Sequence, residues 1–234
     1  MQVFQLDCVD TAPLLTTSLE NQKMLFRSGG ISDAKRYDGV WIPPHVSRFK
    51  RPRERKIKPF CDVSLLLAHA DAPIFSERAK AVFEPILRDS VQWLELDCDE
   101  GKYWILNTLE TVDLDLSKSR LVTFGDGTTG PVKQYAFRSE DLLNKWVFKT
   151  RKHTFRVLCT EPVRELVAAH KLTGFHFTLV WDSLYEPFPE GLDNKTDVKG
   201  RPEIYGPNGI KPLNKEYRKQ FWPLDWFELE SAKK

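Results

Sequence analysis

Three carboxylates lie close together in the middle of the sequence. Asp97, Asp99 and Glu100 precede Gly101 in a segment that separates two apolar stretches. Paired carboxylates can perform general acid and base catalysis, or bind Mg²⁺ or Ca²⁺. Their spacing follows no catalytic or metal-binding rule, however, and acidic residues are common in solvated turns. The more specific interpretation is a negative surface that meets a basic protein, because complementary charge accelerates association and selects partners.

The histidines and cysteines offer one further constellation. His170 and His176 flank Gly174, and the two histidines could approach one another beside Cys159 to bind a metal. Isolated histidines in helices and strands usually serve as hydrogen-bonded structural groups, which is the simpler interpretation. The sequence contains no pattern typical of zinc proteases, serine hydrolases or dinucleotide-binding enzymes. We therefore predict no catalytic residue, no metal ligand and no cofactor-binding residue.

A glycine pair has the spacing of a phosphate-binding loop. Gly125 and Gly130 fit that spacing, but Pro131 occupies the position of the essential lysine. The flanking segments resemble two strands, whereas a phosphate-binding loop must lead into the N-terminus of a helix. We therefore predict a hairpin turn at this position.

Basic and acidic residues are distributed in blocks along the chain. The formal net charge is only +2, but residues 35–60 contain nine basic and two acidic side chains, whereas residues 61–116 contain four and twelve. Residues 117–160 return to nine basic and three acidic side chains. The basic run at 48–58 could bind nucleic-acid phosphates. Nucleic-acid binding is the less favoured alternative, because the overall charge is near zero and an acidic block follows.

The composition is typical of a globular protein from a reducing compartment. The chain has 234 residues, of which 41% are hydrophobic, and it can form a core without disulfides. Its four cysteines are scattered, which is typical of reduced thiols. The sequence has neither a recognisable signal peptide nor an apolar stretch approaching about 18 residues. We therefore expect a cytoplasmic protein without a membrane partner.

Local patterns predict two helices and several strands that would position these residues. Ser76 can cap a helix with apolar residues at helical spacing over 79–87, in which Pro85 should cause a kink or an early end. Thr160 can cap a second helix, which Gly174 should end. Strands are expected at 39–42, 91–96, 102–107, 121–124, 134–137, 146–149, 154–159 and 175–181.

These elements predict an α+β fold. We expect an antiparallel sheet with about two helices packed on one face, and irregular N- and C-terminal segments. The chain should comprise an irregular segment over 1–69 packed on the body, a core over 70–181, and a proline-rich extension over 182–234 docked on that core. The aromatic sequence at 221–227 favours this docking.

Residues 70–181 contain a series of short motifs in a recognisable order. The series comprises Ser76-Glu77-Arg78 at the first helix start, Tyr103 and Asn107, Val112-Asp113 followed by Asp115, and Leu172-Thr173-Gly174 followed by Phe177. In this order the motifs resemble a bacterial immunity-protein family of polymorphic toxin systems, formerly catalogued as a domain of unknown function. The resemblance covers about half of the chain.

This resemblance implies a cytosolic protein that binds and neutralises a cognate toxin and is not an enzyme. The toxin would be encoded by a neighbouring gene, and a basic, nuclease-type toxin would suit the acidic block. Asp97, Asp99 and Glu100 are then the candidate partner-binding residues. Two alternatives stay open. One is a binding module for nucleic acid or another anionic partner that uses the run at 48–58, and the other is an enzyme with a dispersed Asp, Glu and His site.

Overall fold

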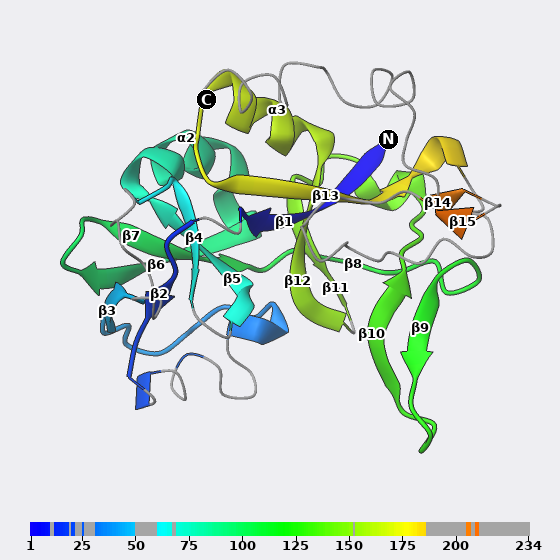
Figure 1. The fold of residues 1–234 in the computed structure, drawn as a ribbon, viewed down its shortest axis with the longest axis horizontal. Helices are drawn as coiled ribbons and strands as arrows, with labels where there is room; N and C mark the ends of the chain where they lie inside the picture. Colours follow the sequence, from blue (N-terminus) through cyan, green and yellow to red (C-terminus); the bar gives the residue numbers. More distant parts are fainter. Residues whose placement is uncertain are drawn as a thin grey trace. The chain divides into compact units, whose positions relative to one another are not determined.

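The chain forms two compact units, Met1–Leu184 and Tyr185–Lys234. In the second unit, β14 (Tyr205–Gly206) and β15 (Gly209–Ile210) form a short antiparallel hairpin. All the other strands and the α-helices described below belong to the first unit (Figure 1). The computed structural model describes residues 1–9, 12–18, 20–21, 25, 31–49, 60–66, 69–151, 153–185, 205–206 and 209–210.

A five-stranded sheet, in the order β13–β1–β12–β11–β8, forms one part of the first unit. In this sheet β1 lies between β12 and β13 and pairs antiparallel with both. Phe4 of β1 is opposite Cys159, and Leu6 is opposite Phe177. The sheet therefore joins the two ends of the unit, because the N-terminal strand β1 pairs with two strands from the C-terminal part. Its strands are β1 (Gln2–Cys8), β8 (Thr111–Val112), β11 (Val147–Thr150), β12 (His153–Thr160) and β13 (Phe175–Asp182).

A closed barrel, in the order β2–β3–β6–β7–β5–β4, forms the other part. The β3–β6 and β2–β4 pairs are parallel, and the remaining pairs are antiparallel. Buried apolar residues such as Ile74, Leu94 and Ile105 fill the interior, and closure leaves no open sheet edge. The strands are β2 (Leu15–Thr16), β3 (His45–Arg48), β4 (Val63–Leu66), β5 (His69–Ser76), β6 (Val91–Cys98) and β7 (Tyr103–Thr108).

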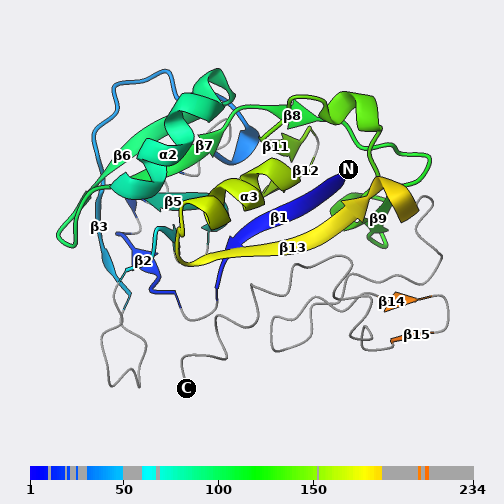
Figure 2. The ribbon, with the colours of Figure 1, turned by 90° about the horizontal axis from the view of Figure 1, so that it is seen from above.

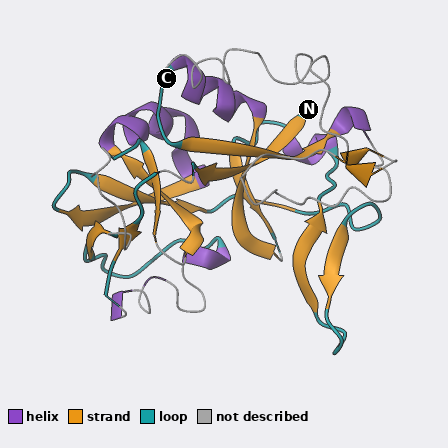
Figure 3. Cartoon of the chain, in the orientation of Figure 1, coloured by secondary structure: helices purple, strands orange, loops and turns teal. Residues whose placement is uncertain are grey.

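Two α-helices, α2 (Glu77–Leu87) and α3 (Glu161–Ala169), cover the strands on one side (Figures 2 and 3). Ser76 caps α2, and its Oγ accepts a hydrogen bond of 3.1 Å from the Ala79 amide. Among the described residues, no helix combines the length and the hydropathy that crossing a bilayer requires. Short 3₁₀ helices occur at Ile31–Asp33, Arg88–Ser90, Ser139–Leu142 and Ser183–Tyr185.

The main core lies between the sheet, the barrel and the two helices. At its centre, the Phe75 ring of β5 lies 5.3 Å from the rings of both Phe83 of α2 and Phe175 of β13, measured between ring centres. Both contacts are edge-to-face, the geometry that aromatic rings favour. Because the buried Phe75 ring of the barrel contacts both a helix and the sheet, the outer face of the barrel and the sheet pack together in this core. The barrel interior forms a second cluster.

A two-stranded arm extends from this body (Figure 1). It consists of β9 (Arg120–Thr123) and β10 (Thr129–Gln134), which pair antiparallel. The ring of Phe124 lies across Gly130, where a Cβ atom would be only 2.7 Å from it. The loop between Gly125 and Gly130 is therefore a hairpin turn, as its sequence predicts.

The predicted α+β fold is confirmed, with corrections among the strands. The N-terminal residues form β1, an interior strand of the sheet, in a segment expected to be irregular. Residues 39–42 form no strand, and the strand lies at His45–Arg48 instead. The sheets are also mixed, because β8 pairs parallel with β11. The division of the chain at residues 69 and 181 stays a prediction, and residues 221–227 lie outside the described residues.

The helix ends differ from their predicted details. Pro85 does not end α2, which continues to Leu87, so this proline lies in the last turn. Thr160 stands at the N-cap of α3, but its hydroxyl donates to the Lys145 carbonyl at 2.6 Å instead of capping the helix. Gly174 lies beyond the end of α3, in the turn before β13. The strand expected at 134–137 ends at Gln134.

Candidate functional site

The predicted acidic residues lie on the hairpin of β6 and β7, which pair along their length. Leu94 and Leu96 are buried in the barrel, whereas Glu95 and Asp97 are exposed. Because successive residues of a strand point to opposite faces, this alternation puts both carboxylates on the outer surface. The turn between the two strands adds the other two predicted carboxylates. The hairpin therefore has an acidic outer face.

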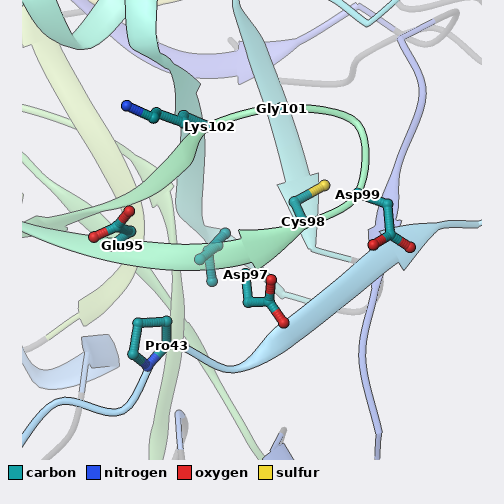
Figure 4. Close-up of a pocket in the computed structure, with 8 residues that line it drawn as sticks. Pro43, Glu95, Asp97, Cys98, Asp99, Gly101 and Lys102 are labelled. Atoms are coloured by element: carbon teal, nitrogen blue, oxygen red, sulfur yellow. The ribbon is translucent and has the colours of Figure 1, made fainter.

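An open hollow of about 490 Å³ lies along this outer face. Its lining includes Pro43 and the three carboxylates Glu95, Asp97 and Asp99. Figure 4 shows that Asp97 points toward β3, whereas the ammonium group of Lys102 points to the other side of the hairpin. The charge that faces this hollow is therefore mainly negative. We refer to Glu95, Asp97, Asp99 and Glu100 as the acidic face.

The predicted carboxylates have different surroundings. Asp97 Oδ2 lies 3.1 Å from His45 Nδ1, and Glu100 Oε1 lies 3.4 Å from Arg48 Nε. The Asp99 carboxylate forms neither a hydrogen bond nor an ion pair with any residue that the structure describes. Two of the three side chains thus have a partner within the protein, and Asp99 is the one most available to a second molecule.

Glu95 extends the acidic face and was not among the predicted site residues. Its carboxylate, like that of Asp99, has no hydrogen-bond or ion-pair partner in the described part of the chain. Only its backbone carbonyl is engaged, accepting a hydrogen bond of 2.8 Å from Trp41 Nε1. The alternation of apolar and acidic residues from Leu94 to Asp97 was the signal that could have identified it.

The basic run at residues 48–58 is described only at its first two residues. Arg48 belongs to β3, and its side chain is only 8% exposed. Its guanidinium group lies over the Phe60 ring, 4.1 Å from the ring centre, in addition to pairing with Glu100. A cation–π contact and an ion pair hold this arginine inside the protein, so its charge partly neutralises the acidic turn. Residues 50–59 lie outside the described residues.

Two ionisable groups lie beneath the acidic turn. Burial raises the pKa of the Cys98 thiol, and the neighbouring Glu100, Asp99 and Asp97 carboxylates raise it as well. Burial, supplemented by the charges of Cys98 and Glu100, raises the pKa of Tyr103 to about 12. Both groups are therefore protonated near pH 7, and neither is an activated nucleophile or base there.

The constellation of His170, His176 and Cys159, which was considered from the sequence but not favoured, is not assembled. Cys159 is completely buried in β12, and burial raises the pKa of its thiol. His170 ends α3, whereas His176 lies within β13, opposite Asp7 of β1. Within the described residues, no group of three or more His, Cys, Asp or Glu side chains is arranged to hold a metal ion.

The sequence also matches a known family over most of its length. The model of the immunity protein family (Imm11) matches residues 19–182. The chain belongs to the Imm11 immunity protein family. No curated protein matches the chain. Membership confirms the resemblance seen in the sequence, and it extends the matched region to include β3 and the edge of the acidic hollow.

Several of the motif residues that signal this immunity family meet at one buried carboxylate, Asp62. Asp62 accepts hydrogen bonds from Ser76 Oγ (2.9 Å) and from Arg78 Nη1 (3.1 Å) at the start of α2. It also accepts bonds from the amide (2.7 Å) and the hydroxyl (3.0 Å) of Thr173, in the turn before β13. The first and last motifs are therefore explained by folding.

Arg78 strengthens the same junction. Its Nη2 donates to the carbonyl of His170 at 2.6 Å and to that of Lys171 at 3.3 Å, at the end of α3. Carbonyl groups at a helix end lack partners within the helix, so a guanidinium group there satisfies them. The first and last motifs of this Imm11 protein thus connect α2, α3 and β13.

Proposed function

We propose that this Imm11 protein neutralises a cognate protein toxin by direct stoichiometric binding, without catalysing a reaction. Membership of the immunity family supports the toxin as partner. The observation that carries the choice of surface is the acidic face, where the Glu95 and Asp99 carboxylates have no partner among the described residues. A toxin with a basic surface, such as a nuclease from a polymorphic toxin system, is the partner that this face fits.

The acidic face would inhibit such a toxin by occlusion. Carboxylates on an exposed turn can occupy the positions in which a basic active site binds the phosphates of its substrate. Because the acidic face is carried by a hairpin of a closed barrel, binding requires little ordering of the backbone, which lowers its entropic cost. Asp97, Asp99 and Glu100 are the residues that we assign to this contact, together with Glu95.

We place this interaction in the cytoplasm, with the toxin encoded by a neighbouring gene. The four cysteines, Cys8, Cys61, Cys98 and Cys159, are all free thiols in the structure. Free thiols persist in reducing compartments, which supports a cytoplasmic site of action. An immunity protein there would meet a toxin that has entered the cell, or one newly made by it.

Co-expression with the product of the neighbouring gene tests the proposal. Wild-type protein should restore growth and co-purify with the toxin in a one-to-one complex. Reversing the charge at three positions (Asp97→Lys, Asp99→Lys and Glu100→Lys) should slow association by about 100-fold at low salt, because electrostatic steering is lost. The wild-type rate should fall with salt, and the variant rate should not.

A matched control separates local charge from total charge. Glu140→Lys, Asp141→Lys and Glu165→Lys make the same change at three exposed positions, two in the 3₁₀ helix Ser139–Leu142 and one in α3. This variant should associate like the wild type. Equal slowing of both variants would contradict the assigned surface, and absence of wild-type rescue would contradict the function. A nucleic-acid titration near 50 mM salt should show no binding, whereas the alternative involving residues 48–58 requires it.

A further inference from the structure

An apolar ridge borders the acidic face. It consists of Val40 and Ile42, which lie on either side of Trp41 in the segment that leads into β3. The side chains of Val40 and Ile42 are 86% and 71% exposed. Pro43, which follows them, is also exposed and lines the acidic hollow. The ridge and the acidic face are therefore continuous.

The ridge has a fixed backbone at its N-terminal side. The Tyr37 amide donates to Gln92 Oε1 at 2.8 Å, and Gln92 Nε2 donates back to the Tyr37 carbonyl at 2.9 Å. Asn107 Nδ2 donates to Gln92 Oε1 at 3.1 Å and to the Lys35 carbonyl at 2.9 Å. Two amide side chains of the barrel thus hold the backbone on which the ridge begins.

The ridge is also held at its centre and its end. Trp41 packs edge-to-face on Tyr37 at 5.2 Å between ring centres, and its Nε1 donates to the Glu95 carbonyl at 2.8 Å. At the far end, the Asp97 amide donates to the Pro44 carbonyl at 3.2 Å. Exposure of aliphatic side chains to water is unfavourable. Val40 and Ile42 nevertheless stay exposed, because these contacts fix the backbone of the segment and prevent the two side chains from packing into the core.

We propose that Val40 and Ile42 are the apolar anchor of the toxin-binding surface and insert into an apolar depression of the toxin that is rimmed by Lys and Arg. This inference rests on the proposed function and adds the contact that supplies affinity. Binding energy usually concentrates in a few apolar or aromatic side chains near the centre of an interface, surrounded by polar residues. Here Glu95, Asp97 and Asp99 form the polar side of the ridge.

The charges select a basic protein over a second copy of the chain. A two-fold dimer that buried this ridge would use the same patch of both copies. It would bring the Glu95 and Asp99 carboxylates of one copy toward those of the other, and like charges across an interface oppose association. A basic partner instead meets these two carboxylates with opposite charge.

Removal of the two aliphatic side chains tests the ridge without changing charge. Val40→Ser with Ile42→Ser should weaken binding to the toxin that wild-type protein neutralises by about 100-fold, mainly through faster dissociation. The salt dependence of binding should stay as in the wild type, because no charge changes. Leu143→Ser with Leu184→Ser, at two other exposed leucines, is the matched control and should bind normally.

The experiment distinguishes failure of the ridge from failure of the proposed function. Unchanged affinity of the Val40→Ser, Ile42→Ser variant beside a wild-type protein that binds would overturn the ridge and leave the proposed function standing. A wild-type protein that neither binds nor protects would overturn both. Analytical sedimentation of the free protein measures whether the chain forms a dimer. A dimer that the same double variant dissociates would show that the occupant is a second copy, and would overturn the assignment of a basic partner.

Discussion

Carboxylates occur in two contrasting settings in this protein. Asp62 is buried and accepts hydrogen bonds from Ser76, Arg78 and Thr173. On the acidic face, by contrast, Asp99 is exposed and has no partner among the residues described. The first carboxylate joins three elements, and the second joins none.

The two settings distinguish a carboxylate that stabilises the fold from carboxylates that are accessible to a second molecule. A buried charge is tolerated only when its hydrogen-bonding capacity is satisfied, so Asp62 commits its neighbours to one arrangement. An exposed charge stays hydrated and adds little to stability, so Asp99 and Glu95 can be substituted at low cost to folding. Motif residues that contact Asp62 are therefore a guide to the fold, and they do not locate the binding surface.

The largest expected effect concerns Asp62. Asp62→Ala should lower the free energy of unfolding by about 4 kcal/mol, because it removes four hydrogen bonds and leaves the Thr173 amide without its acceptor. Urea denaturation measures this change. Asp99→Ala is the comparison and should alter stability by less than about 0.5 kcal/mol. Similar losses of unfolding free energy in the two variants would contradict the distinction between the buried and the exposed carboxylate.

A second prediction concerns the turn that presents Thr173 to Asp62. Gly174 has φ of +86°, and a Cβ atom there would lie 2.3 Å from Cys61 Cβ. Gly174→Ala should therefore cost about 3 kcal/mol, from backbone strain and from overlap. Gly127 has a similar φ of +82° but open space around it, so Gly127→Ala should cost only about 1 kcal/mol.

The two glycines control for each other, because both have a positive φ that is unfavourable for alanine, and only Gly174 has atoms close to the position of a Cβ. Thermal or urea unfolding of both variants gives the difference that crowding makes. Equal costs would show that the junction around Asp62 yields easily. That result would weaken the claim that the junction is rigid and the acidic face adaptable.

The smallest effect concerns Tyr103, which lies between the two settings. Burial, together with Cys98, Glu100 and Asp62, raises its pKa from about 10 to about 12. Its contribution to stability is complete below pH 10 and is lost as the pH rises toward 12, because only the unfolded state ionises readily in that window. The loss at pH 11 should be less than about 1 kcal/mol.

Tyr103→Phe isolates this contribution. Urea unfolding of both proteins at pH 9 and pH 11 gives a difference in stability that should shrink at the higher pH. Using the difference matters, because burial also raises the pKa of Tyr135, which titrates in both proteins. A difference that does not change with pH would show that Tyr103 ionises as easily in the folded state as in the unfolded one.

Much of the local structure follows from local patterns. The apolar face of α2 and the cap at Ser76 are encoded within a few residues, and both are confirmed. The alternation of β6 is also a local pattern, but it was not used, and Glu95 was therefore missed. By contrast, β1 was missed because its partners, β12 and β13, lie more than 140 residues further along the chain. No local pattern specifies such a pairing.

The candidate site was likewise predicted only in part, because its contacts join distant segments. The residues Asp97, Asp99 and Glu100 were identified from their types, but the pairing of Arg48 with Glu100 was not. The exposure of Val40 and Ile42 could not be expected either, because 39–42 resembles a short strand whose aliphatic residues would be buried. Their exposure depends on Gln92 and Asn107 of the barrel, which hold the preceding backbone, and on the hydrogen bond from Trp41 to the Glu95 carbonyl.

The sequence by itself determined the α+β class, the two helices, the acidic turn and the immunity family. These depend on helical spacing, capping, alternation and motif order, which are properties of neighbouring residues. Only the tertiary structure decided that Ser76 and Thr173, brought together from distant motifs, share Asp62. It also decided which carboxylates are neutralised and which face solvent. The physical reason is that burial and pairing depend on contacts between distant segments, and only packing in three dimensions creates those contacts.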